Sequence, residues 1–153
     1  MPPLRLPKRL WRRFDLMRIL AIDHGTKRMG IAASDALGMM AHPLEFIPAQ
    51  PFDAFLKRLK ELLTERETEQ IVVGMPRNMD GSIGPQALKV QAFVAVLKKS
   101  VTVPIVTWDE RLTSVMAEDR LREAGVSARD AKQKVDASAA AVLLQDYMDS
   151  FAG

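Results

Sequence analysis

The chain has 153 residues, of which 48% are hydrophobic and 27% are charged, and its formal net charge of +3 accompanies a composition typical of one soluble globular domain. It has no cysteine, which excludes disulfides, thiolate zinc sites and cysteine nucleophiles. The absence of cysteine suits a cytoplasmic protein. No apolar run approaches the ~18 residues of a membrane-spanning helix, so we expect no membrane partner.

Most of the positive charge lies in the first 17 residues. This Pro- and Arg-rich tail carries a net charge of +4, and the rest of the chain carries −1. The tail lacks the long apolar region of a secretory signal. It is predicted to be either a disordered basic arm or an artefact of start-site choice, because Met17 directly precedes the first predicted strand. We expect residues 18–151 to form the folded domain.

The stretch Arg18–Ser34 predicts a β-hairpin. The apolar run Ile19–Ile22 ends in Asp23, and a turn that contains glycine separates it from a second small apolar run, Ile31–Ala33. Because burying an unpaired charge is costly, Asp23 is predicted to lie where the strand meets solvent. Its carboxylate either accepts hydrogen bonds within the turn or serves as a metal ligand or phosphate-site acid.

The rest of the chain predicts alternating strands and helices. A third strand, Met39–Ile47, contains Pro43, which favours an edge position in the sheet. The later elements, identified from apolar spacing and turn residues, are helix Phe52–Thr68, strand Gln70–Gly74, a helix from Pro85 through Leu97, strand Val103–Trp108, a helix between Thr113 and Gly125, a mobile loop Val126–Lys134, and a last helix from about Asp136 through Tyr147. This order predicts an α/β fold with a mixed sheet and helices on both faces. Trp108 is predicted to be a core residue and not a platform for base stacking.

Three carboxylates lie at the ends of predicted elements. Asp23 ends the first strand, Glu110 follows the last strand, and Asp136 opens the last helix. Ligands of open α/β sheets bind beyond the carboxyl ends of the strands, so the three acids are candidates for one site. Each also has a structural explanation: turn hydrogen bonds for the first, an ion pair with a neighbouring base such as Arg111 for the second, and the amide end of its own helix for the third.

Three carboxylates gathered together would need a cation or raised pKa values, because like charges repel. Hard oxygen ligands favour Mg²⁺ or Mn²⁺, and two such ions are the arrangement used for phosphodiester hydrolysis. The chain has only two histidines, His24 and His42, which are too few to support a metal-binding or general-base role. Polar and basic residues beside the acids are candidates for binding substrate phosphates, with a solvated loop as the equal alternative: Thr26, Lys27, Arg28 and Arg111.

Four motifs resemble those of the YqgF/RuvX family, whose members are named Holliday junction resolvases or pre-16S rRNA nucleases. They lie in the family's order, over about residues 18–150, at Ile22–Gly30, Ile71–Gly81, Asp109–Ser114 and Lys134–Ala140. The first motif alone is weak, because actin-like kinases share a similar Asp-x-Gly-Thr. The four motifs together, in this order, are specific to the family.

The resemblance implies a ribonuclease-H-like fold, with a five-stranded mixed sheet whose first three strands are antiparallel. It also implies that Asp23, Glu110 and Asp136 are the catalytic residues and metal ligands. RuvC-like resolvases carry an acid after the fourth strand, where this chain has Gly74-Met75-Pro76. The resemblance therefore implies that Glu110 substitutes for that acid.

This resemblance implies a metal-dependent endonuclease for structured nucleic acid. The leading function is 5′-end processing of pre-16S rRNA, and the alternative is Holliday junction resolution, which would call for a homodimer with two matched sites. The sequence does not decide between a monomer and a homodimer, or between RNA and DNA as the substrate. Two other classes also stay open: an actin-like nucleotide-binding domain, and a nucleic-acid-binding protein without catalysis.

Overall fold

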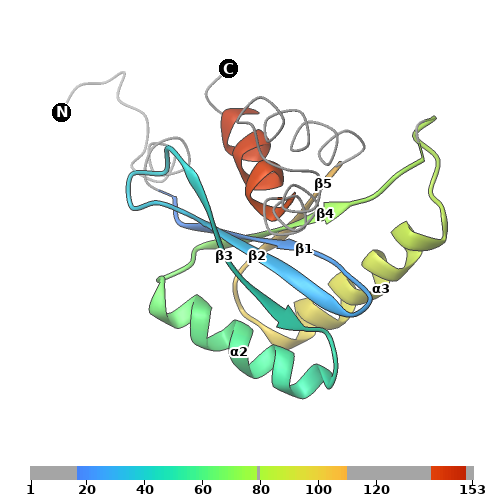
Figure 1. Ribbon diagram of the computed structural model, residues 1–153, viewed down its shortest axis with the longest axis horizontal. Coiled ribbons are helices and arrows are strands. Elements are labelled where there is room, and N and C mark those ends of the chain that lie inside the picture. Colours follow the sequence, from blue (N-terminus) through green and yellow to red (C-terminus); the bar gives the residue numbers. More distant parts are fainter. Residues whose placement is uncertain (1–16, 79, 110–138, 151–153) are drawn as a thin grey trace, which may run out of the picture.

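Five strands form one mixed sheet in the computed structural model, which describes residues 17–78, 80–109 and 139–150 (Figure 1). In chain order they are β1 (Ile19–Asp23), β2 (Arg28–Ser34), β3 (Ala41–Pro48), β4 (Gln70–Met75) and β5 (Ile105–Asp109). They lie side by side in the order β3-β2-β1-β4-β5. β2 runs antiparallel to both β1 and β3, whereas β4 runs parallel to both β1 and β5. The predicted mixed sheet is confirmed, and Pro43 lies on an edge strand as expected.

Helices cover both faces of the sheet (Figure 1). α2 (Phe52–Glu65) and α3 (Pro85–Ser100) pack against one face, and a helix over residues 139–150 packs against the other. The first face forms the larger apolar core, whose fully buried side chains include Ile22, Ile31, Phe55, Val90 and Leu97. Alternation along the strands explains this division, because successive side chains of a strand point to opposite faces.

The second face packs against the C-terminal helix. Ala21, Ala32 and Val72 of the sheet share one cluster with the predicted apolar stripe of that helix, which is Ala140, Leu143, Leu144 and Tyr147. Trp108 packs against the same cluster, and its ring meets that of Tyr147 edge-on at a centroid distance of 5.4 Å. Trp108 therefore packs against this core cluster, as predicted, but it is only half-buried.

Several predicted segments lie outside the described residues. They are residues 1–16 of the basic tail, the helix expected between Thr113 and Gly125, the loop Val126–Lys134, and the expected start of the last helix at Asp136. Within the part of the chain that the structure describes, no helix has the length and apolar character needed to cross a membrane.

α2 ends at Glu65, three residues before the predicted Thr68. Glu67 adopts a positive φ of 51°, its amide donates to the carbonyl of Thr64, and the amide of Thr68 donates to the carbonyl of Leu63. This pair of hydrogen bonds closes the helix in a Schellman motif. Glycine usually occupies the position with a positive φ in this motif. Because Glu67 occupies it here, no glycine signals the end of the helix, and the predicted helix is too long.

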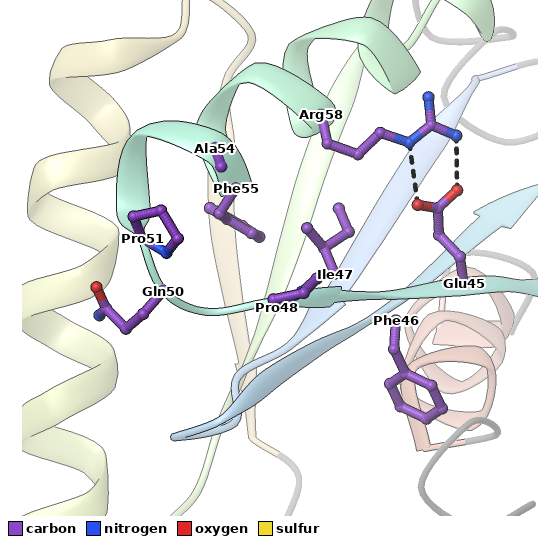
Figure 2. Close-up of a pocket in the computed structure, with 9 residues that line it drawn as sticks. All are labelled: Glu45, Phe46, Ile47, Pro48, Gln50, Pro51, Ala54, Phe55 and Arg58. Carbon is purple, nitrogen blue, oxygen red and sulfur yellow. Dashed lines mark hydrogen bonds and ion pairs between the residues drawn. The ribbon is translucent and has the colours of Figure 1, made fainter.

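An ion pair fixes α2 to the edge strand β3 (Figure 2). Arg58 donates two hydrogen bonds to the carboxylate of Glu45, at 2.7 Å from Nη2 and 3.0 Å from Nε. The pair borders a cavity of about 260 Å³ between β3 and α2, with Ile47, Pro51 and Phe55 among its lining residues. The hydrogen bonds from Arg58 outweigh the effect of burial and hold the pKa of Glu45 below its ordinary value.

We expect Glu45→Gln to lower the free energy of unfolding by about 1 kcal/mol at neutral pH, because a bidentate charged contact is lost at a partly exposed site. A carboxylate whose pKa is lowered in the folded state stabilises the fold above its unfolded pKa, and this contribution disappears as the pH falls through the folded pKa. Urea unfolding at pH 7 and below pH ~4 measures the effect.

The variant and the wild type should therefore converge in stability at acid pH. Glu61→Gln is the comparison, because Glu61 contacts the same arginine through one 3.2 Å bond from a more exposed position. It should change stability by only a few tenths of a kcal/mol, roughly. An equal loss at both pH values would contradict the assignment to the Glu45 carboxylate.

Candidate active site

The carboxyl ends of the three parallel strands share one edge of the sheet. Asp23 is the last residue of β1, and the last residues of β4 and β5, Met75 and Asp109, are paired with each other. β1 lies beside β4 with Ile22 opposite Val73. Asp23 is half-buried at this edge. The predicted position of Asp23 at a strand end is confirmed, and it is the edge where open α/β sheets bind ligands.

Strand alternation assigns Asp23 to one face. Ile19 and Ala21 precede it at two-residue intervals, and both pack in the cluster with the C-terminal helix. On β5, Val106 and Trp108 pack against that same cluster. The carboxylate of Asp23 therefore belongs to the face that the C-terminal helix covers, not to the face of α2 and α3.

The C-terminal helix begins towards the carboxyl edge. Tyr147 donates a 2.8 Å hydrogen bond to the side chain of Gln70, at the start of β4. Gln145 accepts a hydrogen bond from the amide of Ala41 and donates one to the carbonyl of Met39, at the start of β3, which is paired with the end of β2. The later residues of the helix are thus fixed at the amino edge, and its first described turn lies nearer the edge with Asp23 (Figure 1).

The structure describes part of the predicted set. Thr26, Lys27 and Arg28 are exposed in the turn and strand start that directly follow Asp23. Glu110, Asp136 and Arg111 lie outside the described residues. Among the residues that the structure describes, no group of three or more His, Cys, Asp or Glu side chains is arranged to hold a metal.

The turn after Asp23 depends on close backbone packing at Gly25. A Cβ atom at this position would lie 2.1 Å from the carbonyl oxygen of Arg28, which no side chain tolerates. The turn is also tied to the end of β3, since the amide of Ala49 donates to the carbonyl of Lys27 at 2.9 Å. These contacts fix the backbone between the carboxylate of Asp23 and the guanidinium of Arg28.

His24 lies against α3, beside the candidate acid. Its ring centroid is 4.9 Å from that of Phe93, and burial, together with the positive charge of Lys89, lowers the pKa of the imidazole. Its buried Nδ1 atom has no hydrogen-bond partner among the described residues. Sequence reasoning set His24 aside, and its contact with α3 could not be read from local pattern.

The loop after β4 contains a tight turn between Asn78 and Ser82. The amide of Asn78 donates to the carbonyl of Ser82, and the amide of Gly81, at a φ of 87°, donates to the carbonyl of Asn78. The carboxylate of Asp80 accepts hydrogen bonds from the amide and the hydroxyl of Ser82, at 2.9 and 2.6 Å. The predicted turn around Asp80-Gly81 is confirmed, and Arg77, which precedes it, is exposed.

Comparison with protein families gives one match over most of the chain. The family described as "RuvX: Holliday junction resolvase" matches residues 17–150. A protein of Desulforamulus reducens with the printed name "Putative pre-16S rRNA nuclease" is 46% identical over 134 residues, which cover 88% of this chain and 98% of that protein. A Bacillus subtilis protein of the same name is 43% identical over 136 residues, covering 88% of this chain and 99% of its own length.

Solved structures share the fold at low identity. Thermus thermophilus RuvC in complex with a Holliday junction substrate is 16% identical with a TM-score of 0.52, over 88% of this chain and 97% of that one. The fowlpox virus Holliday junction resolvase is 14% identical with a TM-score of 0.51, over 88% of this chain and 99% of that one. The described sheet and helices therefore have the ribonuclease-H-like architecture of these resolvases.

Proposed function

Since this chain belongs to the RuvX family of Holliday junction resolvases, we propose that it is a metal-dependent endonuclease that hydrolyses phosphodiester bonds of structured nucleic acid. The observation that carries the proposal is the position of Asp23 at the carboxyl end of β1, on the face covered by the C-terminal helix. A carboxylate at this edge offers hard oxygen atoms where α/β sheets bind ligands.

Glu110 and Asp136 complete the proposed acid set. Glu110 directly follows Asp109, the last residue of β5, and Asp136 precedes by three residues the first described turn of the C-terminal helix. β5 ends at the carboxyl edge and the helix begins towards it, which supports both assignments. Carboxylate oxygens without thiolates suit Mg²⁺ or Mn²⁺. One or two such ions bound there would lower the pKa of an attacking water and stabilise the leaving oxygen.

Exposed residues next to Asp23 are proposed to bind the substrate backbone. Thr26, Lys27 and Arg28 follow the acid within one tight turn, and Arg111 follows Glu110. Backbone phosphates are bound by such hydroxyl and cationic groups, which position the strand without reading its sequence. In this assignment the chain's own residues place the scissile phosphate beside the carboxylate of Asp23.

Precursor small-subunit rRNA, trimmed at its 5′ end, is the substrate we favour. The curated relatives that share 43–46% identity over nearly their whole length carry the name "Putative pre-16S rRNA nuclease". The structures bound to Holliday junctions share only 14–16% identity, which supports the fold alone. The family description keeps the four-way junction as the second candidate. In either case we propose a cytoplasmic protein, acting as a monomer or homodimer.

A side-by-side cleavage assay tests the substrate. A precursor small-subunit rRNA fragment and a four-way DNA junction are offered with Mn²⁺, and then again with EDTA. We expect cleavage of the RNA with Mn²⁺ and none with EDTA, because the proposed chemistry needs the cation. Symmetric nicking of the junction alone would establish the second candidate. Binding of either substrate without cleavage at any metal concentration would reduce the protein to a nucleic-acid-binding module.

A further inference from the structure

A row of three paired residues connects the candidate acid to an aromatic ring. Asp23 on β1 is directly opposite Gly30 on β2, and Gly30 is directly opposite Phe46 on β3. Directly opposed residues of antiparallel strands present their side chains to the same face. Because Gly30 has no side chain, β2 places nothing between Asp23 and Phe46 in this row. The two side chains lie two strand spacings apart, about 10 Å.

Phe46 is not a core residue of the described structure. It is half-buried, it belongs to neither of the two apolar clusters of the described residues, and its ring points away from the cavity under α2 (Figure 2). The guanidinium carbon of Arg28 lies over this ring, 4.2 Å from its centroid. Arg28 precedes Gly30 by two residues, so it lies on the same face of the sheet as Asp23.

We propose that Phe46 and Arg28 form a stacking subsite for an unpaired nucleobase beside the phosphate that is cleaved at Asp23. The proposal rests on the nuclease function argued above and adds to it a contact with a base. Unstacked bases of single-stranded nucleic acid stack on aromatic rings and on guanidinium planes. Packing against Phe46 orients Arg28 before substrate arrives, so less side-chain freedom is lost on binding.

This subsite selects an extended or splayed strand. A base held on β3 and a phosphate held at Asp23 cannot both engage when the base is stacked within a continuous duplex. The geometry therefore favours a single-stranded end, loop or branch next to the cleaved bond. A purely structural pair, in which Phe46 and Arg28 only brace the edge of the sheet, would affect stability and would not depend on any base of the substrate.

An abasic scan separates these two roles. One abasic site is moved along a short single-stranded RNA, and binding to the wild-type protein is measured by fluorescence anisotropy in EDTA, so that the strand stays intact. We expect affinity to fall about five-fold or more at one position and little elsewhere. With Phe46→Leu, the intact RNA should bind that much more weakly, and the abasic site at that position should have no further effect.

Two variants serve as controls. Phe46→Tyr keeps the ring and should retain the position-dependent loss. Phe52→Leu makes the same change as Phe46→Leu at a half-buried phenylalanine that packs against the core of α2 and α3, and it should leave the scan unchanged. The wild-type scan needs no variant, so a flat scan overturns the subsite even when a variant fails to fold.

The outcomes distinguish this proposal from the proposed function. A flat scan of the wild-type protein overturns the stacking subsite, and so does a Phe46→Leu scan identical to that of the wild type. When the wild type still cuts nucleic acid with Mn²⁺, only the subsite has failed. When the wild type neither binds nor cuts the RNA or the junction, the proposed function has failed and the subsite with it.

Discussion

Replacing Asp23 with asparagine is expected to reduce metal-dependent cleavage by about 10³-fold or more while leaving the fold intact. The substitution keeps the size of the side chain and removes the negative charge that would hold a divalent cation. Charge stabilisation by a catalytic cation is worth several kcal/mol, and each 1.4 kcal/mol corresponds to about ten-fold in rate. The half-buried position of Asp23 at the end of β1 tolerates a neutral amide of equal volume.

The measurement is a time course of cleavage with Mn²⁺, accompanied by thermal unfolding followed by circular dichroism. Asp53→Asn is the matched control, because Asp53 is exposed in the first turn of α2, on the face away from the candidate site. It should cleave like the wild type. Wild-type cleavage by a well-folded Asp23→Asn protein would remove Asp23 from the catalytic set.

Gly25→Ala is expected to have the second large effect, lowering the free energy of unfolding by about 1–3 kcal/mol and abolishing most cleavage. The added Cβ would lie 2.1 Å from the carbonyl oxygen of Arg28, which is backbone and is fixed by its pairing with β3 opposite Pro48. The turn must therefore open. That movement displaces Asp23 on one side and Arg28 on the other, so the acid and the phosphate-binding groups lose their alignment.

Gly84→Ala provides the comparison for this turn. A Cβ at Gly84 would come no closer than 3.2 Å to any atom, and that atom is the side-chain oxygen of Asn78, which can move. We expect this variant to lose less than about 1 kcal/mol. Urea unfolding of both variants gives the stabilities, and the Mn²⁺ assay gives the activities. Equal stability of Gly25→Ala and the wild type would show that the turn relaxes without cost.

Within the described residues, the sequence by itself determined the elements and their types. Apolar periodicity is a local property, so the helical spacing from Phe52 and the short β-branched run before Gly74 sufficed to predict α2 and β4. Pro43 predicted the edge strand for an equally local reason, since proline lacks the amide hydrogen that a central strand must donate. The position of Asp23 at the end of β1 was also predicted locally, because Asp23 directly follows the apolar run Ile19–Ile22.

Beyond the predicted hairpin of β1 and β2, only the tertiary structure decided which of these elements are neighbours. Strand pairing depends on which faces bury one another across long separations in the chain, and no local pattern encodes it. The placement of β1 between β2 and β4 is what puts Asp23 on the edge shared with the ends of β4 and β5. The contacts of His24 with Phe93, and of Arg28 with Phe46, likewise join elements that only the folded sheet and its helices bring together.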